Sequence, residues 1–156
     1  MFAEKIMTTK LVTAKQNEPI SRVIVRMHEA KLRMLPVLND DNHVIGIIST
    51  FSVLNHIVPD YLISGDLSEI SFAPDMGILR REYVKSSSKQ VSEVMSTSPL
   101  FVKPNDSIIS VSANLAGHGR HEYALVVDDE KHLLGVISSG DILNRLEEHA
   151  SEVNDA

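Results

Sequence analysis

The chain contains no cysteine and no tryptophan. Without cysteine it can form neither disulfides nor reactive thiolates, which fits a reducing compartment. Its longest aliphatic runs are about five residues, far short of the ~20 that a membrane-spanning helix needs. Charged Glu4 and Lys5 interrupt the N-terminal stretch in which a secretory signal would carry its apolar segment. Together these absences predict a cytoplasmic protein.

Long basic stretches are also missing. The net charge is −6, and residues 91–156 carry four basic against eleven acidic side chains. The lack of a contiguous basic stripe argues against nucleic acid as the main partner. The 156 residues, 43% of them hydrophobic and 23% charged, suit one well-buried domain or two small ones that share a core.

A nine-residue pattern occurs twice in the chain. Residues 135–143 read G-V-I-S-S-G-D-I-L, and residues 46–54 read G-I-I-S-T-F-S-V-L. Each copy predicts a buried strand that leads into a helix, with polar side chains where the helix begins. Residues 6–9 likewise return as residues 94–97, and the offset grows from 88 to 89 through one extra residue near 117–120. A period of this length indicates a duplicated small domain.

Both copies predict the element order β-α-β-β-α. In the first copy, Asn17, Glu18 and Pro19 precede a helix whose apolar face comprises Ile20, Val23, Ile24 and Met27. The other expected elements are strands at 11–13, 35–38 and 43–48, a turn at 39–42 and a helix at 50–57.

In the second copy, Asp106 is expected to open a helix that ends at Gly117, and strands are expected at 123–127 and 132–137. A last helix is expected to bury Ile142, Leu143 and Leu146 before a frayed acidic tail. One copy alone buries too little surface to be stable. We therefore expect an α+β fold in which the two repeats pack sheet to sheet about a pseudo-twofold axis.

This organisation gives the boundaries 1–57 for repeat 1, 58–90 for an inter-repeat segment, 91–149 for repeat 2 and 150–156 for the acidic tail. The inter-repeat segment is long for a connection, so it is expected to be partly helical. Residues 66–69 could cap a short helix, and residues 86–88, three serines, are expected to be a flexible joint. The segment is interpreted as a loop that covers part of the fold or forms a dimer contact, rather than as a separate functional site.

The element order, the I-M-T-T and L-P-V segments and the repeated G-[IV]-I-S-x-x-[DS]-[IV]-L pattern resemble the tandem cystathionine-β-synthase (CBS) domain pair. The resemblance covers nearly the whole chain apart from the inter-repeat segment. It implies a compact pair that often dimerises and binds AMP, ADP, ATP or S-adenosylmethionine between its repeats, without catalysis. By resemblance the chain is a stand-alone sensor that forms a homodimer and signals to an unknown regulated protein. The alternative is a dimerisation or interaction module that binds no ligand.

Ser138-x-x-Asp141 is the sharpest local signal. On spacing alone it predicts a capping box, a common way to begin a helix. With the resemblance, Asp141 is expected to accept hydrogen bonds from the two hydroxyls of a ribose, and Ser138 matches the hydroxyl residue before it. In the first copy Ser49 and Ser52 stand at these positions. Without a carboxylate, this second site is expected to be weak or empty.

The resemblance assigns further contacts to both expected sites. Those of the nucleotide site are Thr8, Val12, Leu32, Arg33 and Met34. Arg33 could equally be a solvated surface cation. The weaker site would use Leu100, His121 and Tyr123, where Glu122 disfavours a polyphosphate. No cofactor is expected beyond the regulatory ligand.

No metal site is expected. His118 and His121 are interpreted as a chance pair, and His28-Glu29 lacks the second histidine of a zinc-protease helix.

Overall fold

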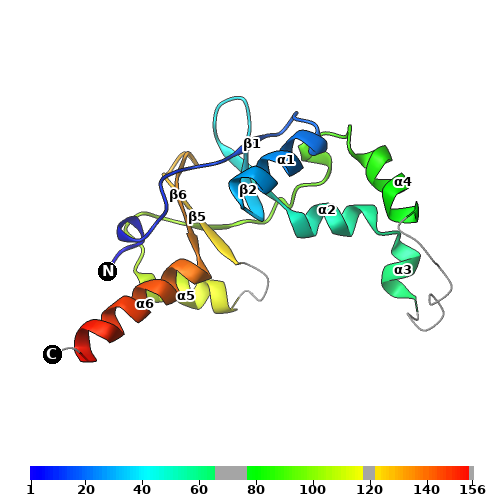
Figure 1. Ribbon diagram of the computed structural model, residues 1–156. Coiled ribbons are helices and arrows are strands. Elements are labelled where there is room, and N and C mark those ends of the chain that lie inside the picture. Colours follow the sequence, from blue (N-terminus) through cyan, green and yellow to red (C-terminus); the bar gives the residue numbers. More distant parts are fainter. Residues whose placement is uncertain (66–76, 118–121, 155–156) are drawn as a thin grey trace. The chain divides into compact units, whose positions relative to one another are not determined.

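A computed structural model describes residues 1–65, 77–117 and 122–154 (Figure 1). It shows a mixed α+β chain with one three-stranded sheet in each repeat, which confirms the expected fold class. The chain divides into two compact units, which are taken in turn below. Unit 1 comprises residues 1–12, 39–44 and 98–156, and unit 2 comprises residues 13–38 and 45–97.

Unit 2 is built on the sheet β1-β2-β3, in which β1 and β2 run parallel. The strands are β1 (Ala14–Lys15), β2 (Met34–Leu38) and β3 (Val44–Ser49). All five residues of β2 are buried, whereas β3 alternates between buried and half-buried side chains. The helices are α1 (Ile20–Ala30), α2 (Thr50–Ile57), α3 (Asp60–Ser64) and α4 (Gly77–Ser86), with a short 3-10 turn η3 at Val91–Glu93.

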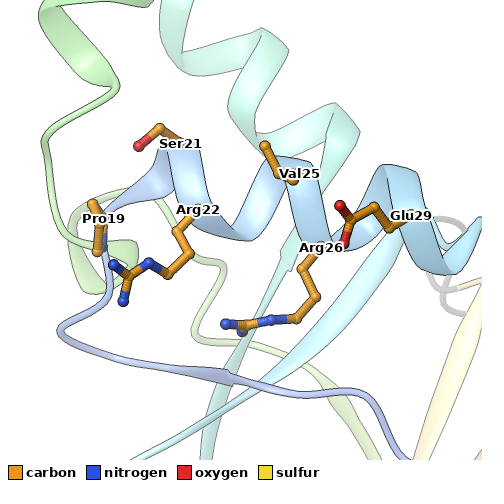
Figure 2. A pocket seen from close by; sticks show the side chains of 6 residues that line it. All are labelled: Pro19, Ser21, Arg22, Val25, Arg26 and Glu29. Carbon is orange, nitrogen blue, oxygen red and sulfur yellow. The ribbon is translucent and has the colours of Figure 1, made fainter.

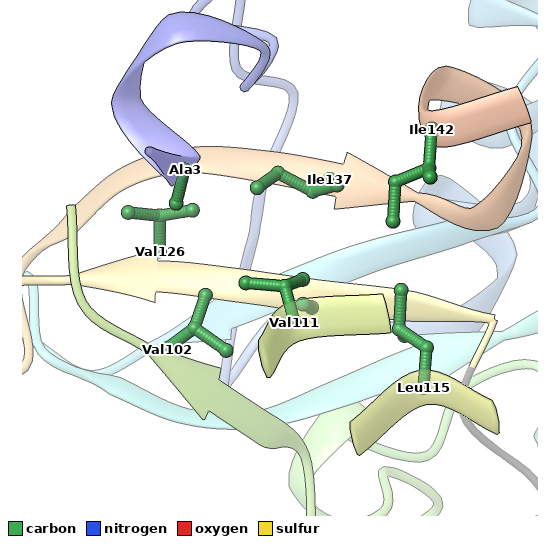
Figure 3. Close-up of a cluster of buried hydrophobic side chains, with 8 residues drawn as sticks. Ala3, Val102, Val111, Leu115, Val126, Ile137 and Ile142 are labelled. Atoms are coloured by element: carbon green, nitrogen blue, oxygen red, sulfur yellow. The ribbon is translucent and has the colours of Figure 1, made fainter. Parts of the chain in front are cut away.

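Unit 1 is built on the sheet β4-β5-β6, with β4 parallel and β6 antiparallel to the central β5. Its elements are η1 (Ala3–Lys5), β4 (Leu100–Val102), α5 (Ile108–Gly117), β5 (Tyr123–Val127), β6 (Leu133–Ser138) and α6 (Ser139–Asn154). Figure 3 shows the core of this unit, in which Val111 and Leu115 of α5 and Ile142 of α6 pack with Val126 and Ile137 of the sheet.

Each sheet is completed by an N-terminal segment from the other repeat. In unit 1, Thr8 forms two backbone hydrogen bonds with Val136 of β6, 2.9 and 3.0 Å long. In unit 2, Ser96 and Ile47 of β3 form the equivalent pair, 2.8 and 2.9 Å long. The I-M-T-T segment of each repeat therefore lies against the G-[IV]-I-S strand of the other repeat.

Several predicted elements match the structure to the residue, while the first strand is displaced. Helix α2 and strand β5 have the expected bounds. The strand expected at 11–13 is instead β1, because the parallel ladder pairs Ala14 with Val37 and Lys15 with Leu38. The carbonyl of Thr13 accepts a hydrogen bond from Arg26 Nη1 at 2.9 Å instead of a ladder bond.

The helix openings are also corrected in detail. Helix α1 begins after Pro19 as expected, but Pro19 at its N-cap forms no side-chain capping bond. Glu18 instead forms two hydrogen bonds with the guanidinium of Arg26 and accepts one from the backbone N–H of Lys15. The Arg26 guanidinium keeps the pKa of the Glu18 carboxyl below its usual value. At the start of α5 the Ser107 hydroxyl accepts from the N–H of Ser110, in the role expected of Asp106.

Helix α6 differs most from its prediction. Ile142 is buried, but Leu143 and Leu146 are 65% and 59% exposed. Every described side chain of α6 after Ile142 is exposed, so only the first turn contributes to the core. The acidic segment expected to fray continues this helix as far as Asn154.

Part of the inter-repeat segment can be compared with its prediction. Helices α3 and α4 confirm that it has secondary structure, and α4 packs against α2. Tyr61 and Ile63 are 63% and 55% exposed. The predicted cap at 66–69 lies outside the described residues. The expected flexible joint is anchored, because Ser86 is buried and the Ser87 carbonyl accepts a hydrogen bond from α1.

None of the helices in the described ranges combines the length and hydropathy that crossing a bilayer demands.

Candidate functional site

The junction between β6 and α6 places an acidic side chain at the opening of a helix. The Asp141 carboxylate accepts a hydrogen bond from the backbone N–H of Ser138 through Oδ2 at 2.8 Å, and the Ser138 hydroxyl accepts from the N–H of Asp141 at 3.0 Å. The two residues therefore form the capping box that their spacing predicts. A carboxylate is favoured here because it lies near the positive end of the helix dipole.

The cap uses only part of the carboxylate. Oδ2 accepts the bond from Ser138, and Oδ1 of Asp141 has no hydrogen-bond partner among the described residues. The Asp141 side chain is half-buried. An ionised carboxylate accepts about four hydrogen bonds, so the cap leaves Asp141 able to accept bonds from a ligand.

Two other predicted residues lie beside this junction in unit 1. Tyr123 is directly opposite Ser138 in the antiparallel β5–β6 ladder, although the prediction assigned it to the weaker site. Thr8 is bonded to Val136, two residues before Ser138, and its side chain is exposed. Leu100 pairs with Ala124 on the far side of β5. Val12 belongs to the same unit and is half-buried.

The matching junction in unit 2 is closed more completely. The Ser49 N–H donates to Ser52 Oγ, the Ser52 N–H donates to Ser49 Oγ, and the Ser52 hydroxyl donates to the Ser49 carbonyl, each at 2.9 Å. The single proton of Ser52 is thus used, and one of its two lone pairs is occupied. Ser52 has far less capacity to bind a diol than Asp141.

The remaining predicted contacts lie in unit 2 or outside the described residues. Leu32 and Arg33 are exposed and Met34 is buried at the start of β2. The Arg33 carbonyl accepts a 2.9 Å hydrogen bond from the N–H of Thr50, which places its backbone next to the Ser49 cap. His121 lies outside the described residues. The grouping of Leu32, Arg33 and Met34 with Asp141 stays a prediction.

Sequence analysis did not assign a role to the two glycines that begin the repeated pattern. A Cβ on Gly135 would lie 2.5 Å from the Sδ of Met7, and one on Gly46 would lie 2.5 Å from the carbonyl oxygen of Ser96. Gly135 therefore allows residues 6–9 to approach β6 closely, and Gly46 allows residues 94–97 to approach β3 closely. The repeat that relates Met7 to Met95 and Gly46 to Gly135 was visible in the sequence, but the contact between the motifs was not.

Unit 2 also has a surface depression along α1, lined by Pro19, Ser21, Arg22, Val25, Arg26 and Glu29. Figure 2 shows the side chains of Arg22 and Arg26 extending from the helix toward the same side. Glu18 forms an ion pair with Arg26, and Glu29 in the same lining carries the opposite formal charge to Arg22. The depression therefore has little net positive charge with which to attract an anion.

Comparison with known proteins identifies the same two repeats. The CBS domain family model matches residues 3–59 and 91–148. "Uncharacterized protein MJ1426" of Methanocaldococcus jannaschii is 31% identical over 158 residues, which covers 94% of this chain and 91% of that protein.

Two solved structures of similar fold contain adenosine compounds. The CBS domain pair of protein MJ0100, in complex with 5-methylthioadenosine and S-adenosyl-L-methionine, aligns with a TM-score of 0.69 at 15% identity, covering 96% of this chain and 98% of that one. CBSX2 in complex with AMP aligns with a TM-score of 0.72 at 20% identity, again covering 96% and 98%. At these identities the likeness establishes the fold.

Proposed function

The chain belongs to the CBS domain family, and from this premise we propose that it is a non-enzymatic sensor that binds an adenosine-containing ligand and signals to a partner protein. The observation that carries the proposal is the Asp141 carboxylate at the opening of α6, which caps the helix through one oxygen and has no protein partner on the other among the described residues. Its half-buried position protects a ligand bond partly from competition by water.

A ribose suits this carboxylate in chemical terms. Its 2′- and 3′-hydroxyls are adjacent donors, and each hydrogen bond to a charged acceptor contributes about 1.5–3 kcal/mol. The same charge repels phosphate, so a nucleotide would bind with its anionic end directed away from Asp141. Thr8, which is bridged to Val136 of β6, and Tyr123 of β5 flank the junction. They are the candidates for contacts with the base.

The family and the local charge both support the proposed class of ligand. The MJ0100 domain pair and CBSX2 were solved with adenosine compounds, which supports AMP, ADP, ATP or S-adenosylmethionine here. The Glu122 carbonyl accepts a hydrogen bond from the N–H of Ser139, so the acidic Glu122 stands close to the same junction. A second negative charge there favours a ligand with few phosphates or with a positive charge.

Occupancy is expected to be unequal between the repeats. The Ser49–Ser52 cap retains little hydrogen-bonding capacity, so we expect one strong site per chain. A ligand that binds one conformation of the protein better than another shifts the population toward that conformation, typically by 1–3 kcal/mol of coupling. In the proposed sensor this shift changes a surface that the partner protein recognises.

Asp141→Ser is the variant that tests the proposal. Ser52 shows that serine completes the same capping box at this position, so the variant removes the carboxylate and retains the cap. Isothermal titration calorimetry with adenosine, AMP, ADP, ATP and S-adenosylmethionine should show at least about tenfold weaker binding than the wild type, because one lost charged bond is worth about 1.4 kcal/mol or more. Asp129→Ser, with a 99% exposed side chain, makes the same charge change in unit 1 and should bind normally.

The outcomes separate the proposal from its alternatives. Unchanged affinity in Asp141→Ser would remove this carboxylate from the site. A wild-type protein that binds none of the five ligands, with no rise in melting temperature, would exclude an adenosine sensor.

The alternative candidate is a ligand-free dimerisation module. It is supported by large apolar side chains exposed on two helices, Phe51 and Leu54 of α2 and Leu143 and Leu146 of α6. Sedimentation equilibrium should show a dimer that Leu143→Glu dissociates, because a buried unpaired charge opposes association. Dimerisation without nucleotide binding would favour this second function over the sensor.

A further inference from the structure

We propose that His43, Glu130 and His132 form a binding site for a divalent transition-metal ion such as Zn²⁺. Each side chain offers one ligand atom, and the three atoms lie within 4.8 Å of one another. All three residues belong to unit 1. The proposal is independent of the adenosine site and departs from the sequence prediction that the chain has no metal site.

The two histidines occupy equivalent positions in duplicated turns. Each turn begins with a side-chain oxygen that accepts two backbone N–H groups, Asn39 Oδ1 from Asp41 and His43 at 3.0 Å, and Asp128 Oδ1 from Glu130 and His132 at 2.9 and 2.8 Å. The residue before each histidine has a left-handed backbone, with φ of 62° and 64°. Both histidines are thus held by ordered turns rather than by mobile loops.

The two turns are joined through their backbones. His43 and His132 form an antiparallel bridge, and the N–H of Val44 donates to the carbonyl of Lys131 at 2.9 Å. The imidazole rings lie edge to face with centroids 4.7 Å apart. Metal ligands that are already positioned lose little conformational freedom when the ion binds.

His132 also has the outer contact that metal-binding histidines commonly make. Its Nδ1 lies 2.9 Å from Asp128 Oδ2. When Nδ1–H donates to the Asp128 carboxylate, the imidazole is held in the tautomer that leaves the Nε2 lone pair for a metal. Such carboxylate–histidine pairs orient the ring and increase its basicity.

Local charge favours a cation at this position. The nearest lysines are engaged elsewhere: Lys103 Nζ contacts Asp129 at 3.1 Å and the Asp128 carbonyl at 2.9 Å, and Lys131 Nζ lies 5.2 Å from the Phe101 ring centroid. Neither lysine forms an ion pair with Glu130 among the described residues. Two imidazoles and one carboxylate suit Zn²⁺, Cu²⁺ or Ni²⁺ better than Mg²⁺ or Ca²⁺, which prefer oxygen ligands.

Calorimetric titration of untagged full-length protein with ZnCl₂ tests the proposal. One Zn²⁺ should bind per chain, and millimolar Mg²⁺ or Ca²⁺ should not displace it. Glu130→Gln should weaken binding at least about tenfold and leave the far-UV circular dichroism unchanged, because this side chain is 78% exposed. The matched control is Glu152→Gln, whose side chain is 76% exposed and lies 3.4 Å from His149. It should bind like the wild type.

Asp128→Asn tests the orienting contact separately. Asn39 performs the same turn role in the first repeat, so asparagine retains the turn while it removes the charge behind His132. Zinc affinity should fall about 10- to 100-fold with the apo melting temperature nearly unchanged. Absence of zinc binding, displacement by Mg²⁺, or an equal loss in Glu130→Gln and Glu152→Gln would overturn the proposal.

Discussion

Gly135→Ala should destabilise the fold by forcing Met7 away from β6. The added Cβ would lie 2.5, 2.7 and 2.9 Å from the Sδ, Cγ and Cβ of Met7, whereas carbon atoms in contact normally lie about 3.5–4.0 Å apart. The Sδ can swing aside, but the Cβ moves only with the backbone of residues 6–9, which is bonded to Val136. We therefore expect the free energy of unfolding to fall by about 1–3 kcal/mol, the usual cost of overpacking.

The assay is urea unfolding followed by far-UV circular dichroism, since the chain has no tryptophan to report by fluorescence. Gly117→Ala is the matched control, because no neighbour in the described ranges lies within 4 Å of a Cβ built there. Within a helix, alanine is favoured over glycine by about 0.8–1.0 kcal/mol, so this variant should be neutral or slightly stabilising. At this chain length each kcal/mol corresponds to about 2–4 °C in the melting temperature.

A double-mutant cycle with Met7→Ala identifies the cause. Removing Sδ and Cγ of Met7 removes the two shortest of the three contacts, so Gly135→Ala should cost less in the Met7→Ala background, with a coupling energy of about 0.5–3 kcal/mol. If Gly135→Ala and Gly117→Ala have the same stability, or if the cycle shows no coupling, the close packing of residues 6–9 against β6 is refuted.

Two further predictions concern single side chains. Glu18→Gln should lower the free energy of unfolding by about 1–2 kcal/mol at neutral pH, because it breaks the ion pair with Arg26. Folding lowers the pKa of Glu18 from about 4.5. The difference in unfolding free energy between the variant and the wild type is therefore present above that pH and should shrink as the pH falls below it. A difference that stays constant across pH would contradict this. Ser52→Asp should raise the calorimetric stoichiometry from one to two adenosine ligands per chain, since Asp141 shows that an acid completes the same cap; an unchanged stoichiometry in a folded variant would refute it.

Sequence analysis succeeded where the determining interactions are local. The α2 helix was predicted to the residue, because its capping box joins positions three apart and its apolar run is short and clearly bounded. The same reasoning found the Ser138–Asp141 cap. It misplaced β1, because a two-residue parallel strand is defined by its partner β2 and not by its own pattern.

The features that sequence analysis missed depend on contacts between distant parts of the chain. The repeat offset relates Met7 to Met95 and His43 to His132, but periodicity does not say that related segments touch. Met7 lies against Gly135, and His43 lies against His132. The predicted burial of Leu143 and Leu146 was wrong for a different reason. A helical apolar pattern does not show where the helix extends beyond the core.

The duplication also separates what the fold requires from what a ligand requires. At the hairpin turn and at the helix cap, the first repeat has neutral Asn39 and Ser52, while the second has Asp128 and Asp141. Within each pair the side chains accept the same backbone hydrogen bonds. The neutral residues show that the fold does not need either carboxylate. A carboxylate costs more to desolvate than an amide or a hydroxyl, and the two in repeat 2 add to a strongly acidic half. The two proposed ligands would give a physical reason for both charges: Asp141 would bind the sugar hydroxyls, and Asp128 would orient His132 toward a metal ion.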